Sequence, residues 1–271
     1  MNSFKHRVMV ISAVLALVLG VGSAVAAQGD TLNLLYWQAI STMNPFLSGG
    51  TKDLHAGSLV LEPLARYDEN GGIVPLLVDE IPTVDNGGVA EDLLSITWKL
   101  KEGLIWSDGT PVTADDAVFS WQYCTDEATG CAQVQNFTDV TSVEAVDAQT
   151  IKVTFGVPKP YPYGPFVGQT SVILQKAQFA DCVGTAAQTC TDQNFYPIGT
   201  GPYVVDEFRA NDVVTLSANP NYREEGKPYF QHVVLKGGGD AESAARAVLE
   251  TGEADYAWNL QVAPEILAQM E

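Results

Sequence analysis

The chain has 271 residues, of which 46% are hydrophobic, and it carries a formal net charge of −19. A negative field of this size repels nucleic-acid phosphates and anionic membrane surfaces, so neither is an expected partner. The acidity is interpreted as a means of keeping the protein soluble, also in a saline habitat. The alternative interpretation is that it attracts cationic solutes. The length suffices for a substantial hydrophobic core.

Residues 1–27 have the pattern of a secretory signal peptide. Lys5 and Arg7 precede an apolar run at 8–21, and an Ala-x-Ala cleavage signature follows this run. An uncleaved membrane anchor is the alternative, but the run is shorter than the about 20 apolar residues that span a bilayer. We therefore expect an exported protein, periplasmic or extracytoplasmic, whose mature chain begins just after the signature and carries a charge of −21.

The first element expected in the mature chain is a strand at 32–37, which ends in two aromatic residues. An apolar stretch at 58–64 predicts a short helix. A second strand is predicted at 94–100, because Ile96 and Trp98 alternate with polar residues and so share one buried face.

A tight turn and a capped helix are expected after this second strand. Gly109 is free to take the positive φ that the turn needs. Thr113 and Asp116 have the spacing of a capping box, and apolar residues then recur at helical spacing as far as Trp121. Negative charge is also favoured at a helix amino terminus. We expect a structural role for Trp106, Ser107, Asp108, Gly109, Thr113 and Asp116.

Two hairpins are predicted further along the chain. Their strands are at 140–146 and 150–155, and at 203–208 and 213–216, with turn residues between the members of each pair. Strands and helices are interspersed without strict β-α-β alternation. This pattern favours a mixed α/β (α+β) fold.

The last complete helix expected follows three glycines at 237–239. Asp240 is its expected N-cap, Ala244 and Ala247 belong to its apolar stripe, and Gly252 is its C-cap. The final residues, 264–271, read as the start of a further amphipathic helix.

Four cysteines in an exported chain predict two disulfide bonds. Three pairings are open; we favour Cys124 with Cys131 and Cys182 with Cys190, because the members of each pair are close in sequence. A zinc site would need paired C-x2-C motifs or histidine partners, which these spacings do not supply. No cysteine precedes Cys124, so a lipid-anchored mature amino terminus is not expected.

Little in the sequence indicates an enzyme. Outside the signal peptide only His55 and His232 remain, and neither H-E-x-x-H nor G-x-S-x-G occurs. Asp108, Asp115 and Asp116 could serve as the paired carboxylates of an exported hydrolase, but turn and capping roles account for them. We expect no catalytic residue, no cofactor and no metal ion.

Several blocks of this sequence resemble one family, the bacterial extracellular solute-binding proteins of family 5, which bind peptides, oligopeptides and nickel. Residues 197–203 resemble the family's G-T-G-P-Y turn, 218–229 its N-P-x-Y element, and 247–260 its helix followed by G-E-x-D. The first block resembles the family's turn Gly-Leu-x-Trp-Ser-Asp-Gly and the helix start after it. Its matching residues are Gly103, Leu104, Trp106, Ser107, Asp108, Gly109, Pro111, Thr113, Ala114, Asp116 and Phe119.

The resemblance implies a periplasmic binding protein-like fold, with two lobes joined by a hinge and a subdomain inserted in the first lobe. It places the start of lobe one at 28–58, the inserted subdomain at 59–195, the return to lobe one at 196–258 and the start of lobe two at 259–271. Family members are roughly twice as long. We therefore expect a truncated sequence with lobe one and its insertion largely present; a naturally short one-lobe protein is the alternative.

Ligands of two-lobed binding proteins lie between the lobes, against strand ends and hinge crossings. The strand end at Tyr36, Trp37 and Gln38 and the crossing at Trp258 and Asn259 are therefore candidate ligand-binding residues. Ordinary core packing of Trp37 and Trp258 is the alternative. Clamping residues of lobe two would lie beyond the last residue of this sequence, so the resemblance does not identify the solute.

The function implied by the resemblance is solute capture for an ATP-binding cassette importer. The protein would bind a peptide or a similar small solute, close around it as a monomer and dock on a membrane permease. A ligand-sensing receptor of the same fold is one alternative, and the exported hydrolase considered above is the other.

Overall fold

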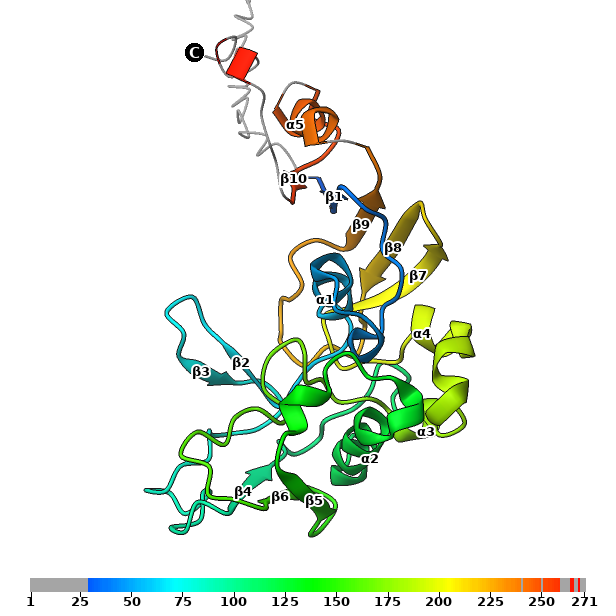
Figure 1. Cartoon of the computed structure of the whole chain (residues 1–271). Helices are drawn as coiled ribbons and strands as arrows, with labels where there is room; N and C mark the ends of the chain where they lie inside the picture. Colours follow the sequence, from blue (N-terminus) through cyan, green and yellow to red (C-terminus); the bar gives the residue numbers. More distant parts are fainter. Residues whose placement is uncertain (1–28, 240, 250, 259–263, 266–267, 269–271) are drawn as a thin grey trace, which may run out of the picture.

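A computed structural model describes residues 29–239, 241–249, 251–258, 264–265 and 268 (Figure 1). The predicted signal peptide, the predicted N-cap Asp240 and the candidate Asn259 therefore lie outside the described residues, as does most of the helix start predicted near the end of the sequence. Within the described ranges, none of the helices combines the length and apolar character needed to span a membrane.

A five-stranded sheet forms one part of the molecule, in the order β10-β1-β9-β8-β7 (Figure 1). Strand β1 runs parallel to both of its neighbours, whereas β7, β8 and β9 are antiparallel. The strands are β1 (Thr31–Tyr36), β7 (Tyr203–Arg209), β8 (Val213–Ala218), β9 (His232–Gly237) and β10 (Tyr256–Ala257). Helix α1 (Thr51–Gly57) follows β1 in the chain, and α5 (Ala241–Leu249) lies between β9 and β10.

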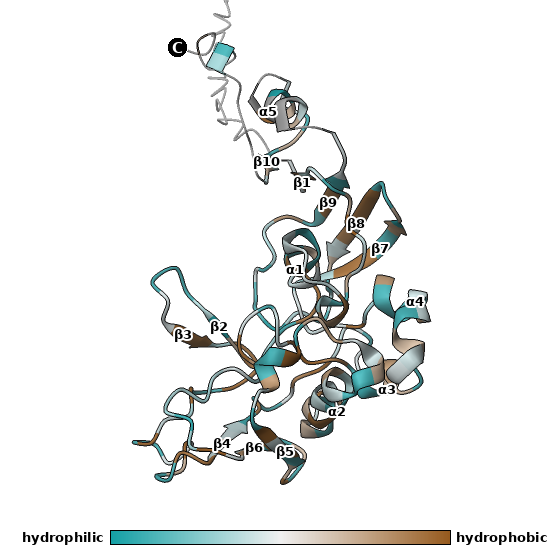
Figure 2. Ribbon diagram, in the orientation of Figure 1, coloured by the Kyte–Doolittle hydropathy of each residue, from teal (hydrophilic) through white to brown (hydrophobic). Residues whose placement is uncertain are grey.

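The sheet and the segment after β1 enclose a hydrophobic core, here called the sheet core. Figure 2 shows the hydrophobic residues along β8 that contribute to it. The hairpin predicted at 203–216 is confirmed as β7 and β8, and Asn211 in its turn has a φ of 62°, a conformation that asparagine tolerates well. Buried members of the sheet core include Tyr36, Ile40, Met43, Val60, Leu216 and Leu235.

The remaining elements surround a second and larger core, here called the motif core. A three-stranded antiparallel sheet, in the order β4-β6-β5, lies on it, and β2 pairs with β3 as a separate two-stranded arm. The elements are β2 (Ala65–Tyr67), β3 (Ile73–Pro75), β4 (Ser95–Lys99), β5 (Val140–Ala145), β6 (Thr150–Phe155), α2 (Ala114–Thr125) and α3 (Lys176–Phe179), with short 3-10 turns at Pro45–Leu47, Glu127–Thr129, Val134–Phe137 and Gly184–Thr189. Helix α4 (Thr191–Phe195) follows the last of these turns, and its Phe195 packs against the sheet core.

The strand–turn–helix unit of the sequence motif is confirmed in this second part. Ile96 and Trp98 on β4 are both fully buried. Gly109 has a φ of 85° in the turn. The backbone N–H of Thr113 donates to Oδ2 of Asp116 at 2.9 Å in a capping box that starts helix α2. Hairpin β5–β6 is also found at the predicted place.

The helix predicted at 58–64 is wrong: the chain is helical at Thr51–Gly57 instead and then turns. The carbonyl groups of Leu59 and Val60 accept hydrogen bonds from the N–H groups of Tyr203 and Gly201, at 3.1 and 2.9 Å. These carbonyls are therefore not available to continue a helix. An apolar stretch that is buried all round gave the same sequence signal as a buried helix.

The glycine pair of the Gly-Thr-Gly motif makes this crossing sterically feasible. A Cβ atom on Gly199 would lie 1.9 Å from the carbonyl oxygen of Val60, and one on Gly201 would lie 2.7 Å from the carbonyl oxygens of Leu59 and Val60. Only glycine lets the two backbones approach so closely. The motif thus joins the returning segment to the segment that follows α1.

Both predicted disulfide bonds are confirmed, Cys124 with Cys131 and Cys182 with Cys190. Cys124 and Cys182 are buried in the motif core, and Cys131 and Cys190 pack against it. The edges of the lobes and of the inserted subdomain stay a prediction.

Candidate functional site

The parallel strands β1, β9 and β10 end at the same edge of the five-stranded sheet. Tyr36 is paired with Gly237, and Leu35 with Ala257. The N–H of Trp258 then donates to the carbonyl of Leu35 at 2.9 Å. In open sheets with parallel strands, ligands bind at the carboxyl ends of the strands. This edge is therefore the place where the geometry favours a binding site.

Four of the predicted site residues lie at this edge, and we call Tyr36, Trp37, Gln38 and Trp258 the strand-end cluster. The rings of Tyr36 and Trp258 are stacked, with centroids 6.4 Å apart and planes inclined by 23°. Tyr36 is only 3% exposed, so its ring supports Trp258 from within the sheet core. The fifth candidate, Asn259, lies outside the described residues.

Trp37 and Gln38 differ from Tyr36 because both are exposed, and Trp37 exposes 48% of its surface. The chain must change direction at once after them. A Cβ atom on Gly237 would lie 1.9 Å from Cα of Ala39, so the segment after Trp37 crosses directly over the end of β9. The structure thus brings Tyr36 and Trp258 together and presents Trp37 and Gln38 at the surface; their role in binding stays a prediction.

His55 on helix α1 contacts the strand-end cluster through Tyr36. Its Nδ1 lies 3.2 Å from the hydroxyl of Tyr36. The pKa of Tyr36 is raised to about 12, mainly by burial and to a smaller extent by the charge interaction with Tyr256. The hydroxyl of Tyr36 therefore stays protonated at neutral pH. Burial also lowers the pKa of His55, which favours the neutral ring that can accept a hydrogen bond. No sequence signal pointed to this contact between positions 19 residues apart.

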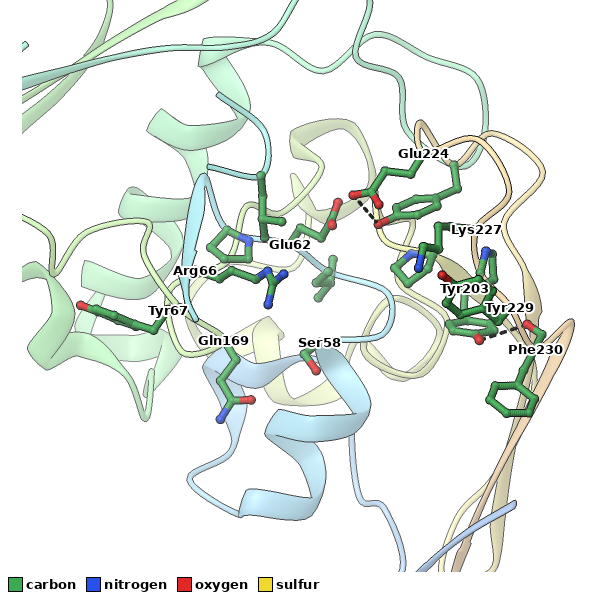
Figure 3. Close-up of a pocket in the computed structure, with 17 residues that line it drawn as sticks. Ser58, Glu62, Arg66, Tyr67, Gln169, Tyr203, Glu224, Lys227, Tyr229 and Phe230 are labelled. Carbon is green, nitrogen blue, oxygen red and sulfur yellow. Dashed lines mark hydrogen bonds between the residues drawn. The ribbon is translucent and has the colours of Figure 1, made fainter. Parts of the chain in front are cut away.

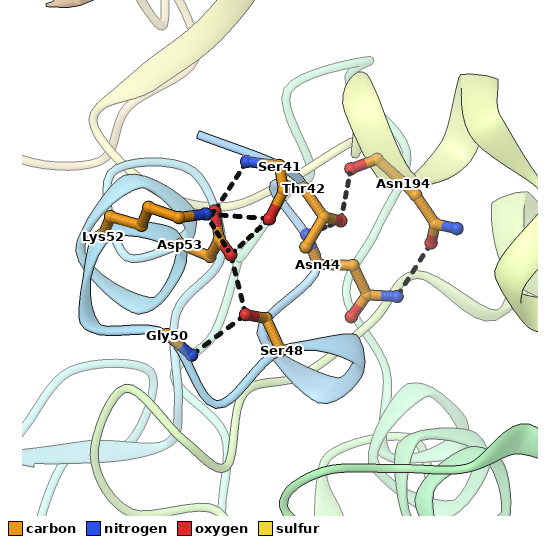
Figure 4. Close-up of polar contacts among 8 residues, drawn as sticks. All are labelled: Ser41, Thr42, Asn44, Ser48, Gly50, Lys52, Asp53 and Asn194. Atoms are coloured by element: carbon orange, nitrogen blue, oxygen red, sulfur yellow. Dashed lines mark hydrogen bonds and ion pairs between the residues drawn. The ribbon is translucent and has the colours of Figure 1, made fainter. Parts of the chain in front are cut away.

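A buried carboxylate fixes the segment that follows the strand-end cluster (Figure 4). Asp53 is 1% exposed and accepts hydrogen bonds from the N–H and the hydroxyl of Ser41, at 2.7 and 2.6 Å. It also accepts from the hydroxyl of Ser48 at 2.7 Å and from Nζ of Lys52 at 2.8 Å. One side chain of α1 therefore holds both ends of the segment 41–48.

The same segment is held from the other side by Asn194 on α4, as Figure 4 also shows. The amide of Asn44 donates to Oδ1 of Asn194 at 3.0 Å, and the hydroxyl of Thr42 donates to its backbone carbonyl at 3.3 Å. Sequence reasoning missed this polar network. The adjacent Lys52 and Asp53 were its only local signal, because the other partners are brought together by the fold.

The aspartates considered for hydrolysis are engaged in structural contacts. Asp108 accepts hydrogen bonds from Thr110 at 2.9 and 2.6 Å and from Gln175 at 3.0 Å. Asp116 is 6% exposed and holds the backbone N–H groups of Thr113 and Lys176, each at 2.9 Å. Burial raises the pKa of Asp116, although these hydrogen bonds oppose the shift. Within the described ranges, no cluster of histidine, cysteine and acidic side chains is arranged to hold a metal ion.

This arrangement of strands and helices is that of the periplasmic binding protein-like fold. The structure superposes on Haemophilus influenzae OppA in complex with RPPGFSPFR with a TM-score of 0.76 and 20% sequence identity, covering 90% of this chain and 48% of that chain. For NikZ from Campylobacter jejuni in complex with Ni(L-His), the TM-score is 0.72 and the identity 26%, covering 89% and 45%. The mixed fold expected from the sequence is thereby confirmed.

The chain belongs to the bacterial extracellular solute-binding proteins, family 5, whose model for the middle region matches residues 72–270. The glutathione-binding protein GsiB of Escherichia coli (strain K12) is 23% identical over 218 residues, which are 80% of this chain and 40% of GsiB. The chain thus spans less than half the length of the curated relatives it matches.

Proposed function

We propose that the chain belongs to the solute-capturing component of an ATP-binding cassette importer and acts outside the cytoplasm. Membership of family 5 is the observation that carries the proposal. A peptide or a similar small solute is the proposed cargo, because the relatives are named for glutathione and one similar structure holds a nine-residue peptide. The protein would be exported by the signal peptide at 1–27, without a lipid anchor, and would work as a monomer.

In this proposal the strand-end cluster contributes one wall of the solute site. Trp37 and Gln38 present an aromatic surface and an amide, which provide stacking and hydrogen bonding respectively. Tyr36 and Trp258 would supply the rigid base beneath them. The polar network around Asp53 would keep the segment 41–48 in place. Solute binding would then cost little conformational entropy in this segment.

Transport would follow from preferential binding to the closed state. A second lobe, begun at 259–271 in the proposed layout, would close over the strand-end cluster, and the closed form would dock on a membrane permease. Closure requires only that the solute has a higher affinity for the closed than for the open conformation. The structural contacts of Asp108 and Asp116 weigh against a hydrolase, and no covalent step is needed.

The decisive experiment is native mass spectrometry of the full-length protein purified from its own cells, followed by calorimetric titration with the solute identified. We expect a bound peptide or other small solute that is released intact. Release of a cleaved product would contradict the proposal, and so would the recovery of Met1 in exported protein. Uptake of the solute that is lost when the permease gene is deleted would distinguish transport from sensing.

A further inference from the structure

Two pairs of asparagine followed by glycine occur in the sequence, Asn70-Gly71 and Asn86-Gly87. The first pair lies in the turn between β2 and β3, and the second lies in the loop between β3 and β4. Asparagine is a thermolabile residue. Because glycine has no Cβ atom, its backbone nitrogen is the least hindered neighbour for an asparagine amide group. The chain thus offers two positions at which the same reaction can be compared.

The backbone surroundings of the two pairs are nearly the same. Both asparagines are exposed. Gly71 has a φ of 79° and Gly87 a φ of 74°. The N–H of Gly71 donates to the carbonyl of Asp68 at 3.1 Å, and that of Gly87 donates to the carbonyl of Val84 at 3.1 Å. A Cβ atom on either glycine would meet no other atom within 4 Å. Access and backbone geometry therefore do not distinguish the two positions.

The side chain of Asn86 is held by three hydrogen bonds. Its Oδ1 accepts from the backbone N–H groups of Thr83 and Gly88, at 2.8 and 3.0 Å. Its Nδ2 donates to the carbonyl of Ile81 at 3.0 Å. The amide group of Asn86 cannot turn toward the nitrogen of Gly87 unless these contacts are broken.

Asn70, by contrast, is held only by its main chain. Its backbone N–H donates to Oδ1 of Asp68 at 2.9 Å, and the N–H of Gly72 donates to the same oxygen at 2.7 Å. Among the described residues, none is hydrogen-bonded to the side chain of Asn70. Its amide group can therefore rotate toward the nitrogen of Gly71 without breaking a contact within the protein.

The tip of the β2–β3 arm can also adjust its backbone. Figure 1 shows the arm projecting from the rest of the molecule. Residues 69–72 are all exposed, and none of them belongs to either hydrophobic core. Exposed loop tips open locally at a low cost in free energy. The turn can thus reach the geometry of a ring closure while both cores stay packed.

We propose that Asn70 is a site of spontaneous deamidation, with water as the only co-reactant. The backbone nitrogen of Gly71 attacks Cγ of Asn70 and loses its proton to the solvent. The new N–Cγ bond closes a five-membered succinimide, and the Cγ–Nδ2 bond breaks with release of ammonia. Water then adds to one of the two ring carbonyls and opens the ring, which leaves aspartate or isoaspartate. No electron is transferred in any of these steps.

The reaction changes the arm in two ways. Either product adds one negative charge, and isoaspartate also lengthens the main chain by one carbon atom within the turn. The longer turn no longer matches the pairing of Arg66 with Val74 and of Tyr67 with Ile73. Arg66 and Tyr67 also line a groove of about 700 Å³ beside the arm (Figure 3). Deamidation thus alters the wall of this groove. The inference does not depend on solute capture, because the arm contains no residue of the strand-end cluster.

The first test is incubation of the full chain at mildly alkaline pH, followed by digestion after glutamate and mass spectrometry. Glu80 lies between the two pairs, so each asparagine is recovered on its own peptide. Asn70 should convert at least about tenfold faster than Asn86, because three hydrogen bonds restrain only the latter. The two rates should become similar in concentrated urea. Equal rates in the folded protein, no conversion of Asn70, or a difference that persists in urea would overturn the proposal.

The second test labels isoaspartate with a protein isoaspartyl methyltransferase in aged samples of two variants. Asn70→Gln should lose most of the label, because the longer side chain closes a ring less readily. Asn86→Gln is the matched control and should keep the wild-type label. Thermal unfolding shows that each variant is folded. Undiminished label in Asn70→Gln, or its loss in a folded Asn86→Gln variant, would place the reaction elsewhere and refute the site.

Discussion

The motif core and the sheet core use their polar side chains in different ways. Around the motif core, Asp108 and Asp116 are fully engaged by neighbouring donors, and both disulfide bonds lie in this part of the molecule. At the edge of the sheet core, by contrast, Trp37 and Gln38 are exposed at the end of a parallel strand. The most conspicuous sequence motif of this chain thus supports stability, and the candidate site is marked by a much weaker pattern.

The polar network on Asp53 is the exception on the side of the sheet core, and breaking it should have the largest effect. We expect Asp53→Ala to lower the free energy of unfolding by about 3 kcal/mol, because Lys52 and two serines lose a shared buried acceptor. Urea denaturation measures the loss. The control is Lys159→Ala, which removes the exposed ion pair with Asp139 and should cost less than about 1 kcal/mol. Equal losses in the two variants would contradict a central role of the network.

Because of the same carboxylate, the free energy of unfolding should decrease at acidic pH. Burial raises the pKa of Asp53, but hydrogen bonds from Lys52, Ser41 and Ser48 outweigh burial and lower the pKa below its ordinary value. The stabilisation is therefore present above the unfolded pKa of about 3.9 and is lost as the pH falls through the lower folded pKa. Urea denaturation of Asp53→Asn between pH 7 and pH 3 should show a shallower acid-induced loss than the wild type.

Removing a disulfide should destabilise the motif core by a similar or slightly smaller amount. Each bond closes a short loop, with its cysteines 7 or 8 positions apart, for which chain entropy predicts about 2–3 kcal/mol. Replacement of either pair by alanines, followed by denaturation, measures this. Solute affinity should not change, since neither bond belongs to the strand-end cluster. A pair whose removal abolished binding in a folded variant would show that the two regions are coupled.

The neighbouring aspartates at the start of α2 allow a finer test of the motif core. Asp116→Ala removes the capping box and should cost about 1–2 kcal/mol. Asp115→Ala, at an exposed position of the same turn, should cost less than about 0.5 kcal/mol. Differential scanning calorimetry on both variants decides it. Loss of a hydrolytic activity in a folded Asp116 variant would instead favour the enzyme.

The smallest effect on stability is expected at the strand-end cluster, where solute affinity is the relevant readout. Trp37→Ala should change the free energy of unfolding by less than about 0.5 kcal/mol and weaken solute binding by about 1–2 kcal/mol. Trp258→Ala should lower both quantities, because its ring also packs on Tyr36. Calorimetry of solute binding to the full-length variants is the measurement. Normal binding by Trp37→Ala would remove Trp37 from the site.

Short-range patterns in the sequence determined much of the motif core. Alternation predicted β4, the spacing of Thr113 and Asp116 predicted the start of α2, and the spacing of the cysteines predicted both bridges. These features depend on residues a few positions apart, whose side chains meet whatever the rest of the chain does. The strand predicted at 32–37 is observed as β1 (Thr31–Tyr36), one residue earlier at each end.

Only the tertiary structure decided the contacts between distant segments. The stretch at 58–64 has the sequence pattern of a helix, but its carbonyl groups accept hydrogen bonds from the N–H groups of Gly201 and Tyr203 in the returning segment. Likewise, Glu62 meets Arg223 over about 160 residues of intervening chain. No local sequence pattern predicts such long-range contacts, because they depend on how the two cores pack. The sequence by itself thus determined the family and the elements that local patterns specify, such as β4 and the start of α2, whereas packing determined the path of the chain at 58–64 and the buried polar network.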